Sequence, residues 1–177
     1  MKKLTLIRHT RPNIPAGVCY GQLDVGVADS FSVEAAVIKD LIQTADILIA
    51  SPLLRTKRLA EYLAAEFECA WREDMRLMEM HFGDWEGRSW NEISRHEIDA
   101  WAADILYYSP QGGESASQMM QRVQAVLEEL ARLPQRHIVL VVHGGTIRAI
   151  LSALANFSLA DILRWQIEYG AVIQVKL

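Results

Sequence analysis

The chain has 177 residues, of which 51% are hydrophobic, and it carries a formal net charge of −4 at pH 7. This length suits one domain with a sizeable core, so we expect a single domain over residues 1–177. The negative charge argues against nucleic acid as a partner, because such binding usually needs a basic face.

The sequence carries no motif for a membrane anchor or a metal centre. No apolar run approaches the roughly 20 residues that a spanning helix requires, and the first run is far too short for a signal peptide. The two cysteines, Cys19 and Cys69, lie in no metal-binding spacing. We therefore expect a cytoplasmic protein with reduced thiols and no membrane partner.

The first predicted strand ends on two side chains that can carry positive charge. Residues 4–7 are apolar or β-branched, which predicts a strand buried on both faces, and Pro12 prevents its continuation. Arg8 and His9 follow directly, and the proline and glycine residues of 13–27 predict a loop that wraps this site.

Two further apolar runs end in the same manner. Residues 46–50 precede Arg55, and residues 138–142 precede His143. In open α/β sheets the carboxyl ends of the strands are where ligands bind. Two arginines and two histidines at one such edge would repel one another unless an anion lay between them, and phosphate is the commonest anion that planar arginine groups bind.

Helical spacing of apolar residues predicts two helices around the second strand. The first is expected at 29–44, with Ser30 or Ser32 as its N-cap. Its apolar residues, expected to pack on the sheet, are Val33, Val37, Leu41 and Ile42. The second is expected at 56–67, with an apolar face made of Leu59, Tyr62, Leu63 and Phe67.

An ordered, acid-bearing loop is predicted after a short strand at 69–71. Glycines and aromatic residues in 76–87 favour a loop with aromatic anchors. Its acids Glu79, Asp84 and Glu86 compete for the role of proton donor, and their spacing alone does not choose among them.

A helix through about Ile105 is predicted from the capping box of Ser89 and Glu92. Its apolar side is made of Trp90, Ile93, Ile98 and Trp101. Trp90 and Trp101 could form a pocket for a flat ring, although tryptophans at this spacing are more often part of a core.

A second capping box predicts a long helix that begins near Ser115 and Gln118. Its apolar face is made of Met119, Val123, Val126, Leu127 and Leu130. Glu114, just before this helix, could hold residues of the site in place without contacting the substrate, or it could serve only as an acid at a helix start.

The C-terminal elements complete an α/β/α sandwich around a mostly parallel sheet. Gly144 and Gly145 open a helix through Leu154, whose first backbone N–H groups can face an anion. We also expect a helix at 158–164 and an edge strand at 171–175. The alternation of strands and helices is what favours this fold.

Four strings, in order along the chain, resemble the motifs of the histidine phosphatase (phosphoglycerate mutase-like) superfamily. They are Arg8 to Thr10, Ser51 to Thr56, Glu79 to Gly87 and Val142 to Arg148. The resemblance implies a small helical lid at approximately 84–113. It also implies a phosphatase of small phosphomonoesters that uses no cofactor or metal. Independently of the resemblance, we expect a monomer or homodimer.

The resemblance also assigns roles to individual residues. His9 is implied as the nucleophile and Glu79 as the proton donor. The groups implied to bind phosphate are Arg8, Arg55, His143 and Gly144, and His143 also counts among the catalytic residues. Neutral imidazole is available near pH 7, and the neighbouring arginines would oppose protonation of His9 and keep it reactive.

The loop after the first strand resembles that of one branch, the α-ribazole phosphatases of cobalamin biosynthesis. Thr10 and Pro12 are followed by a Cys-Tyr-Gly string. This branch implies α-ribazole 5′-phosphate as the substrate. The residues that could contact it are Thr10, Cys19, Tyr20, Gly21 and Trp90.

Three other interpretations remain open from the sequence. A phosphoglycerate mutase-like or broad-specificity phosphatase would share the same motifs. His9, His143 and Glu79 could form a zinc site, although two adjacent arginines disfavour a cation. A module that binds a phosphorylated ligand without catalysis is the third.

Overall fold

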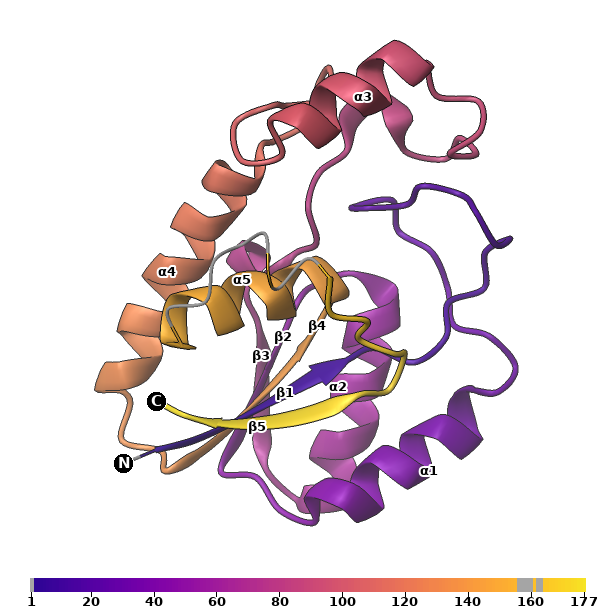
Figure 1. Ribbon diagram of the computed structural model, residues 1–177. Coiled ribbons are helices and arrows are strands. Elements are labelled where there is room, and N and C mark those ends of the chain that lie inside the picture. The colour runs from indigo at the N-terminus through magenta and orange to yellow at the C-terminus, as the bar shows by residue number, and fades with distance from the viewer. Residues whose placement is uncertain (1, 156–160, 162–163) are drawn as a thin grey trace.

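The computed structural model describes residues 2–155, 161 and 164–177 and has a five-stranded sheet between two layers of helices (Figure 1). The strand order is β3-β2-β4-β1-β5, and only β5 runs antiparallel to its neighbour. The strands are β1 (Lys3–Arg8), β2 (Ile47–Ala50), β3 (Ala70–Glu73), β4 (His137–Val142) and β5 (Val172–Lys176). The α/β/α sandwich predicted from the sequence is confirmed.

Alternate residues of each central strand contact opposite helical layers, as the two-residue period of a strand requires. Leu140 of β4 packs with α4 (Ala116–Arg132) and α5 (Gly144–Ala155). Val141, the next residue, packs with α1 (Phe31–Ile42) and α2 (Leu54–Phe67). Both layers therefore cover continuous apolar strands, which explains why the strands show no polar alternation.

The face of α1 that packs on the sheet differs from the predicted one. Ala35, Ile38 and Ile42 are buried, whereas Val33 and Val37 are 72% and 55% exposed, and Leu41 is also exposed. Apolar residues occupy two stripes of this helix, and contact with the sheet selects the stripe that contains the smaller Ala35. Ser30 is the N-cap residue, but its side chain makes no capping hydrogen bond.

The helix predicted from Ser89 begins six residues later, because the backbone of this segment pairs with the N-terminal loop. The Ser89 N–H does donate to Glu92 Oε2 (3.1 Å), but residues 90–92 form a turn and no helix begins before Arg95. The N–H of Trp90 donates to the carbonyl of Gly17 (2.9 Å), and Ser89 pairs with Val18. The helix that follows, α3 (Arg95–Ala103), lies apart from the sheet in Figure 1.

An aromatic cluster joins α3 to the rest of the segment expected to form a lid. Two short 3-10 helices, η1 (Met75–Leu77) and η2 (Gly83–Trp85), precede α3 in the chain. The cluster comprises Cys19, Phe82, Trp85, Trp90, Ile93, Ile98, Trp101 and Tyr108. The rings of Trp90 and Trp101 stack on each other at 6.2 Å, so the space between them is filled. The preferred interpretation, that these two tryptophans are part of a core, is confirmed.

The remaining predicted elements are mostly confirmed. All five predicted apolar residues of α4 are buried, and the expected short strand and edge strand are β3 and β5. The helix expected at 158–164 lies almost wholly outside the described residues. None of the described helices is long and apolar enough to cross a bilayer.

The capping box at Ser115 gives a stability prediction. Its hydroxyl accepts from the N–H of Gln118, and the Gln118 side chain accepts in return from the N–H of Ser115. We expect Ser115→Ala to lower the free energy of unfolding by about 1 kcal/mol in urea denaturation.

Ser94→Ala is the matched control for this prediction. Ser94 is the N-cap residue of α3, but its side chain makes no capping hydrogen bond. Equal losses of stability in the two variants would contradict the prediction.

Candidate active site

The carboxyl ends of β1, β2 and β4 bring the four predicted cationic side chains together. Arg8 ends β1, His9 follows it, Arg55 lies in the first turn of α2, and His143 joins β4 to α5. The rings of His9 and His143 lie 5.2 Å apart, measured between centroids. His9, Arg55 and His143 are each at most 1% exposed.

A backbone carbonyl fixes the orientation of the His9 ring. Nδ1 lies 2.7 Å from the carbonyl oxygen of Thr10. Since a carbonyl only accepts, Nδ1 carries the proton and donates it, which leaves the lone pair of a neutral ring on Nε2. The ring is thus oriented for nucleophilic attack through Nε2.

Burial keeps both histidines neutral. The pKa of His9 lies well below its usual 6.5, first because burial penalises the charged ring and then because the Arg55 guanidinium is close. The pKa of His143 is lowered by the same two causes, in the same order. His143 Nε2 lies 2.8 Å from the hydroxyl oxygen of Ser51.

Arg55 is a fully buried arginine that fastens the N-terminal loop to the site. Its Nη1 donates to the carbonyl of Leu23 (2.9 Å), and its Nη2 donates to the carbonyl of Gly21 (2.6 Å). Its guanidinium also lies 5.0 Å from the ring centroid of Tyr20. Burial lowers the pKa of Arg55, and the nearby Glu79 carboxylate partly offsets this effect.

Four buried polar atoms at these strand ends have no hydrogen-bond partner within the described residues. They are Arg8 Nε, Thr10 Oγ1, Arg55 Nε and His143 Nδ1. Buried polar groups are nearly always hydrogen-bonded, so such a group of orphans marks a place where a ligand completes the bonding. Because three of these atoms belong to residues that carry or can carry positive charge, the ligand that fits is an anion.

The start of α5 closes the site beside Arg8. A Cβ atom added at Gly144 would lie 3.6 Å from Arg8 Nε and 3.3 Å from Arg148 Nη1. This position therefore has little room for a side chain. The backbone N–H groups at a helix start add a favourable field for an anion here.

Among the three acids of the 76–87 segment, Glu79 contacts the start of α5. Its Oε2 accepts from the N–H of Gly145 (3.0 Å), and its Oε1 accepts from the N–H of Met80 (3.0 Å). Glu86 is instead engaged by the backbone N–H groups of Gln22 and Phe82, both at 2.9 Å. Asp84 Oδ1 lies near Gly112, where an added Cβ atom would be 3.6 Å from it.

The candidate substrate-contacting residues fall into two groups. Thr10 and Gly21 lie at the anion site, and the Tyr20 hydroxyl lies 2.9 Å from that of Tyr169. Cys19 is 1% exposed within the aromatic cluster, and its thiol has almost no surface to offer a substrate. Trp90 lies in the same cluster.

Sequence reasoning missed Tyr169 and the position of Arg148. The Tyr169 ring lies 3.9 Å from the guanidinium carbon of Arg8 and 5.5 Å from the His9 ring. Arg148 Nη2 donates to the carbonyl of Trp165 (2.8 Å). Tyr169 precedes the edge strand as a single tyrosine without a motif, so only the antiparallel return of β5 places it here.

A cavity of about 180 Å³ adjoins Glu79 and was also missed. Its wall is mostly apolar and includes side chains of Phe82, Trp101, Ile105, Ala116, Met119 and Met120, together with Glu79 and Arg148. Trp101 and Ile105 belong to the predicted lid, and the other residues come from α4, from α5 and from the segment 78–82 that carries Glu79. The cavity therefore lies where the predicted lid, α4 and α5 approach the segment that carries Glu79.

The metal-site interpretation needs three ligands within reach of one cation. The structure contains no group of three or more histidine, cysteine or acidic side chains with that arrangement across residues 2–155, 161 and 164–177. The chemistry that the described groups can perform is the binding of a phosphoryl group, attack by an imidazole and proton transfer by a carboxyl group.

Comparison with known proteins gives one family and several phosphatases. The profile of the Histidine phosphatase superfamily (branch 1) matches residues 4–177. Glucosyl-3-phosphoglycerate phosphatase of Mycobacterium tuberculosis is 29% identical, over 90% of this chain and 78% of the relative. Adenosylcobalamin/alpha-ribazole phosphatase of Salmonella typhimurium is 24% identical, over 95% of this chain and 87% of the relative. The native structure of a mycobacterial glucosyl-3-phosphoglycerate phosphatase superposes with a TM-score of 0.86, at 27% identity, over 98% of this chain and 89% of the other.

The two neutral histidines predict how stability depends on pH. The pKa values of His9 and His143 are lowered in the folded chain from the 6.5 expected in the unfolded chain. Below pH 6.5 the unfolded state therefore binds more protons, so the free energy of unfolding falls as the pH falls from there. Urea denaturation between about pH 5 and pH 7.5 measures this slope.

His143→Gln removes one of the two groups, and we expect a shallower slope below pH 6.5 in that variant. An unchanged slope would contradict the assignment of a depressed pKa to His143.

Proposed function

The chain belongs to the histidine phosphatase superfamily and is a phosphoric monoester hydrolase, and we propose that it works without a metal through a phosphohistidine on His9. The observation that carries this proposal is the buried, neutral His9 ring whose Nδ1 is held by the Thr10 carbonyl. Nε2 attacks the phosphorus atom while the bond to the leaving oxygen breaks.

Arg8, Arg55, His143 and Gly144 bind the phosphoryl oxygens in this proposal. The buried orphan donors of both arginines support this role. Ser51 Oγ lies 3.5 Å from the N–H of Leu53, which donates to it, and 2.8 Å from His143 Nε2. If the Ser51 hydroxyl donates to Nε2, the proton of neutral His143 lies on Nδ1 and can be donated to a phosphoryl oxygen.

Glu79 is the proton donor in this proposal. In the first half-reaction its carboxyl group protonates the leaving oxygen as the P–O bond breaks. In the second, its carboxylate takes a proton from water as the water oxygen attacks phosphorus and the P–N bond breaks. Phosphate leaves, and neutral His9 and protonated Glu79 are restored.

We propose a single domain over residues 1–177 in which approximately 84–113 form a lid over the substrate. The cavity beside Glu79 supports this division, because residues of that segment, Trp101 and Ile105, form one wall and Met119 and Ala149 form another. A cytoplasmic location and a monomeric or homodimeric state stay predictions.

The substrate that we propose is α-ribazole 5′-phosphate, in the nucleotide-loop pathway of cobalamin biosynthesis. The apolar, aromatic wall of the cavity suits a flat base linked to a phosphorylated sugar, and a relative with this activity in its name is 24% identical. Glucosyl-3-phosphoglycerate is the second candidate. Its support is the 29% identical relative and Arg148, a cation beside the cavity that could bind a carboxylate.

The nucleophile assignment predicts a loss of activity without a loss of fold. We expect His9→Asn to lower kcat for p-nitrophenyl phosphate by about 10⁴-fold or more, with an unchanged circular dichroism spectrum. We also expect the unmodified enzyme to keep its activity after exhaustive chelation. Turnover by folded His9→Asn near the unmodified rate would contradict the mechanism, and loss on chelation would contradict its metal independence.

The substrate assignment predicts a preference in kcat/KM for α-ribazole 5′-phosphate over glucosyl-3-phosphoglycerate and 3-phosphoglycerate. Ala116→Phe, which fills the cavity, should lower kcat/KM for the ribazole ester by roughly tenfold or more and change that for p-nitrophenyl phosphate little. Equal use of all three esters would leave the phosphatase chemistry standing and contradict the ribazole assignment.

A further inference from the structure

Glu79 lies in a segment without regular structure, and that segment has to be held by other parts of the chain. Residues 78–82, between η1 and η2, form no helix or strand. Their backbone carbonyl and N–H groups therefore lack the partners that regular structure provides. The position of the Glu79 carboxyl group depends on whichever side chains supply those partners.

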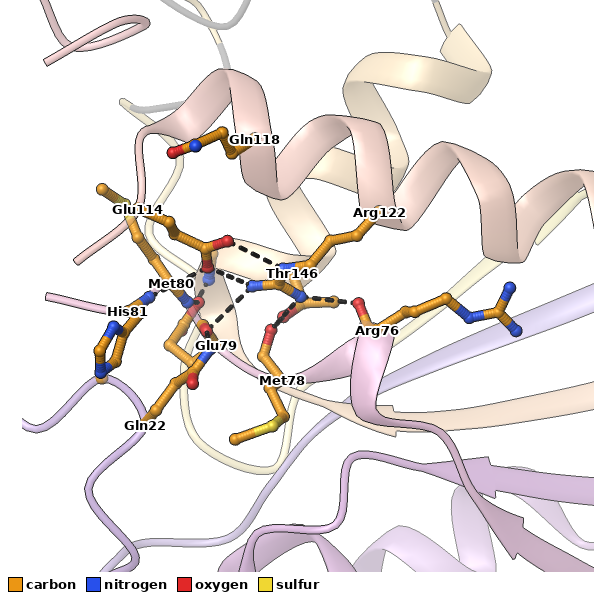
Figure 2. Close-up of polar contacts among 12 residues, drawn as sticks. Gln22, Arg76, Met78, Glu79, Met80, His81, Glu114, Gln118, Arg122 and Thr146 are labelled. Atoms are coloured by element: carbon orange, nitrogen blue, oxygen red, sulfur yellow. Dashed lines mark hydrogen bonds and ion pairs between the residues drawn. The ribbon is translucent and has the colours of Figure 1, made fainter. Parts of the chain in front are cut away.

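Arg122, on the second turn of α4, donates to three of these carbonyls or their immediate neighbours. Its Nη1 donates to the carbonyls of Arg76 (2.6 Å) and Met78 (2.7 Å), and its Nη2 donates to the carbonyl of Glu79 itself (3.0 Å). Figure 2 shows this guanidinium reaching from α4 to the chain on the N-terminal side of Glu79. One planar guanidinium group thus donates to three carbonyls within residues 76–79.

Glu114 completes the arrangement on the other side. Its Oε1 accepts from the N–H of His81 (3.0 Å), and both of its oxygens accept from Arg122 (Figure 2). The side chains of Glu114 and Arg122 are only 17% and 18% exposed, so water competes little for this ion pair. The pair therefore holds the backbone on both sides of Glu79.

Two further side chains contact the same segment. Gln22 Nε2 donates to the carbonyl of Glu79 (2.9 Å), and Thr146 Oγ1 lies 3.2 Å from the carbonyl of Met78. A Cβ atom at Gly145 would lie only 2.2 Å from Glu79 Oε1, so the carboxyl group fits against α5 with no room to shift toward it.

We propose that Arg122, paired with Glu114, is a positioning residue that holds the Glu79 carboxyl group where it can protonate the leaving oxygen. This inference rests on the proposed role of Glu79 as the acid. General acid catalysis requires the proton within hydrogen-bond reach of the leaving oxygen, so a displacement of about 1 Å is enough to reduce it strongly. Neither Arg122 nor Glu114 needs to touch the substrate.

The test compares two esters of similar shape that differ in their need for an acid. The p-nitrophenolate group leaves with little protonation, whereas the leaving oxygen of phenyl phosphate needs a proton. We expect Arg122→Met and Glu114→Gln each to lower kcat/KM for phenyl phosphate by roughly 10- to 100-fold and to change that for p-nitrophenyl phosphate much less. A purely structural role would lower both values by the same factor.

Arg76→Gln is the matched control, because the Arg76 side chain forms ion pairs with Asp74 and Glu129 and points away from Glu79 (Figure 2). We expect it to leave the ratio of the two kcat/KM values unchanged. Arg122→Lys keeps the charge but lacks the planar fork, so we expect it to show the selective loss as well.

Glu79→Gln tests the acid role of Glu79 separately from the positioning role of Arg122 and Glu114. A selective loss in Glu79→Gln, with equal losses for both esters in Arg122→Met and Glu114→Gln, overturns the positioning role alone. Equal losses in Glu79→Gln overturn the acid assignment and, with it, the inference. If Arg122→Met does not fold, as judged by circular dichroism, the two kcat/KM values of Glu114→Gln test the positioning role instead.

Discussion

The burial of positive charge at the carboxyl ends of β1, β2 and β4 is the constraint on which the site depends. Removing an ion from water costs several kcal/mol even in relaxed proteins, and Arg55 is fully buried. The structure meets this cost with carbonyl acceptors on Arg55 and with two histidines that stay neutral. The orphan donors that remain define the space for an anion.

Arginines also hold the irregular segments around the site. Arg55 on α2 binds carbonyls of the N-terminal loop, Arg8 at the end of β1 binds the carbonyl of Ile167, and Arg122 on α4 binds the segment around Glu79. Regular elements anchored in the core thus fix the loops through guanidinium groups. Precise placement of a site on loops requires this kind of support from rigid elements.

The sequence predicts the strands and their functional ends well, since long apolar runs and the motifs that follow them are local features. The sequence-based prediction fails where contacts between distant parts of the chain determine the structure. The stripe of α1 that packs on the sheet and the late start of α3 both depend on partners distant in the chain. The local sequence does not reveal the roles of Tyr169 and Arg122 either. Tyr169 is a single tyrosine without a motif, and an arginine on the polar side of an amphipathic helix is normally interpreted as solvent-exposed.

The central claim is that the phosphoryl group passes through His9, and trapping the intermediate tests it most directly. The enzyme would be mixed with ³²P-labelled p-nitrophenyl phosphate, quenched in alkali within milliseconds and mapped by mass spectrometry. The account predicts one labelled peptide, containing residues 8–10, with phosphorus on His9 Nε2, because Nδ1 is bonded to the Thr10 carbonyl. Label on another residue, or active enzyme without label in the burst phase, would contradict it.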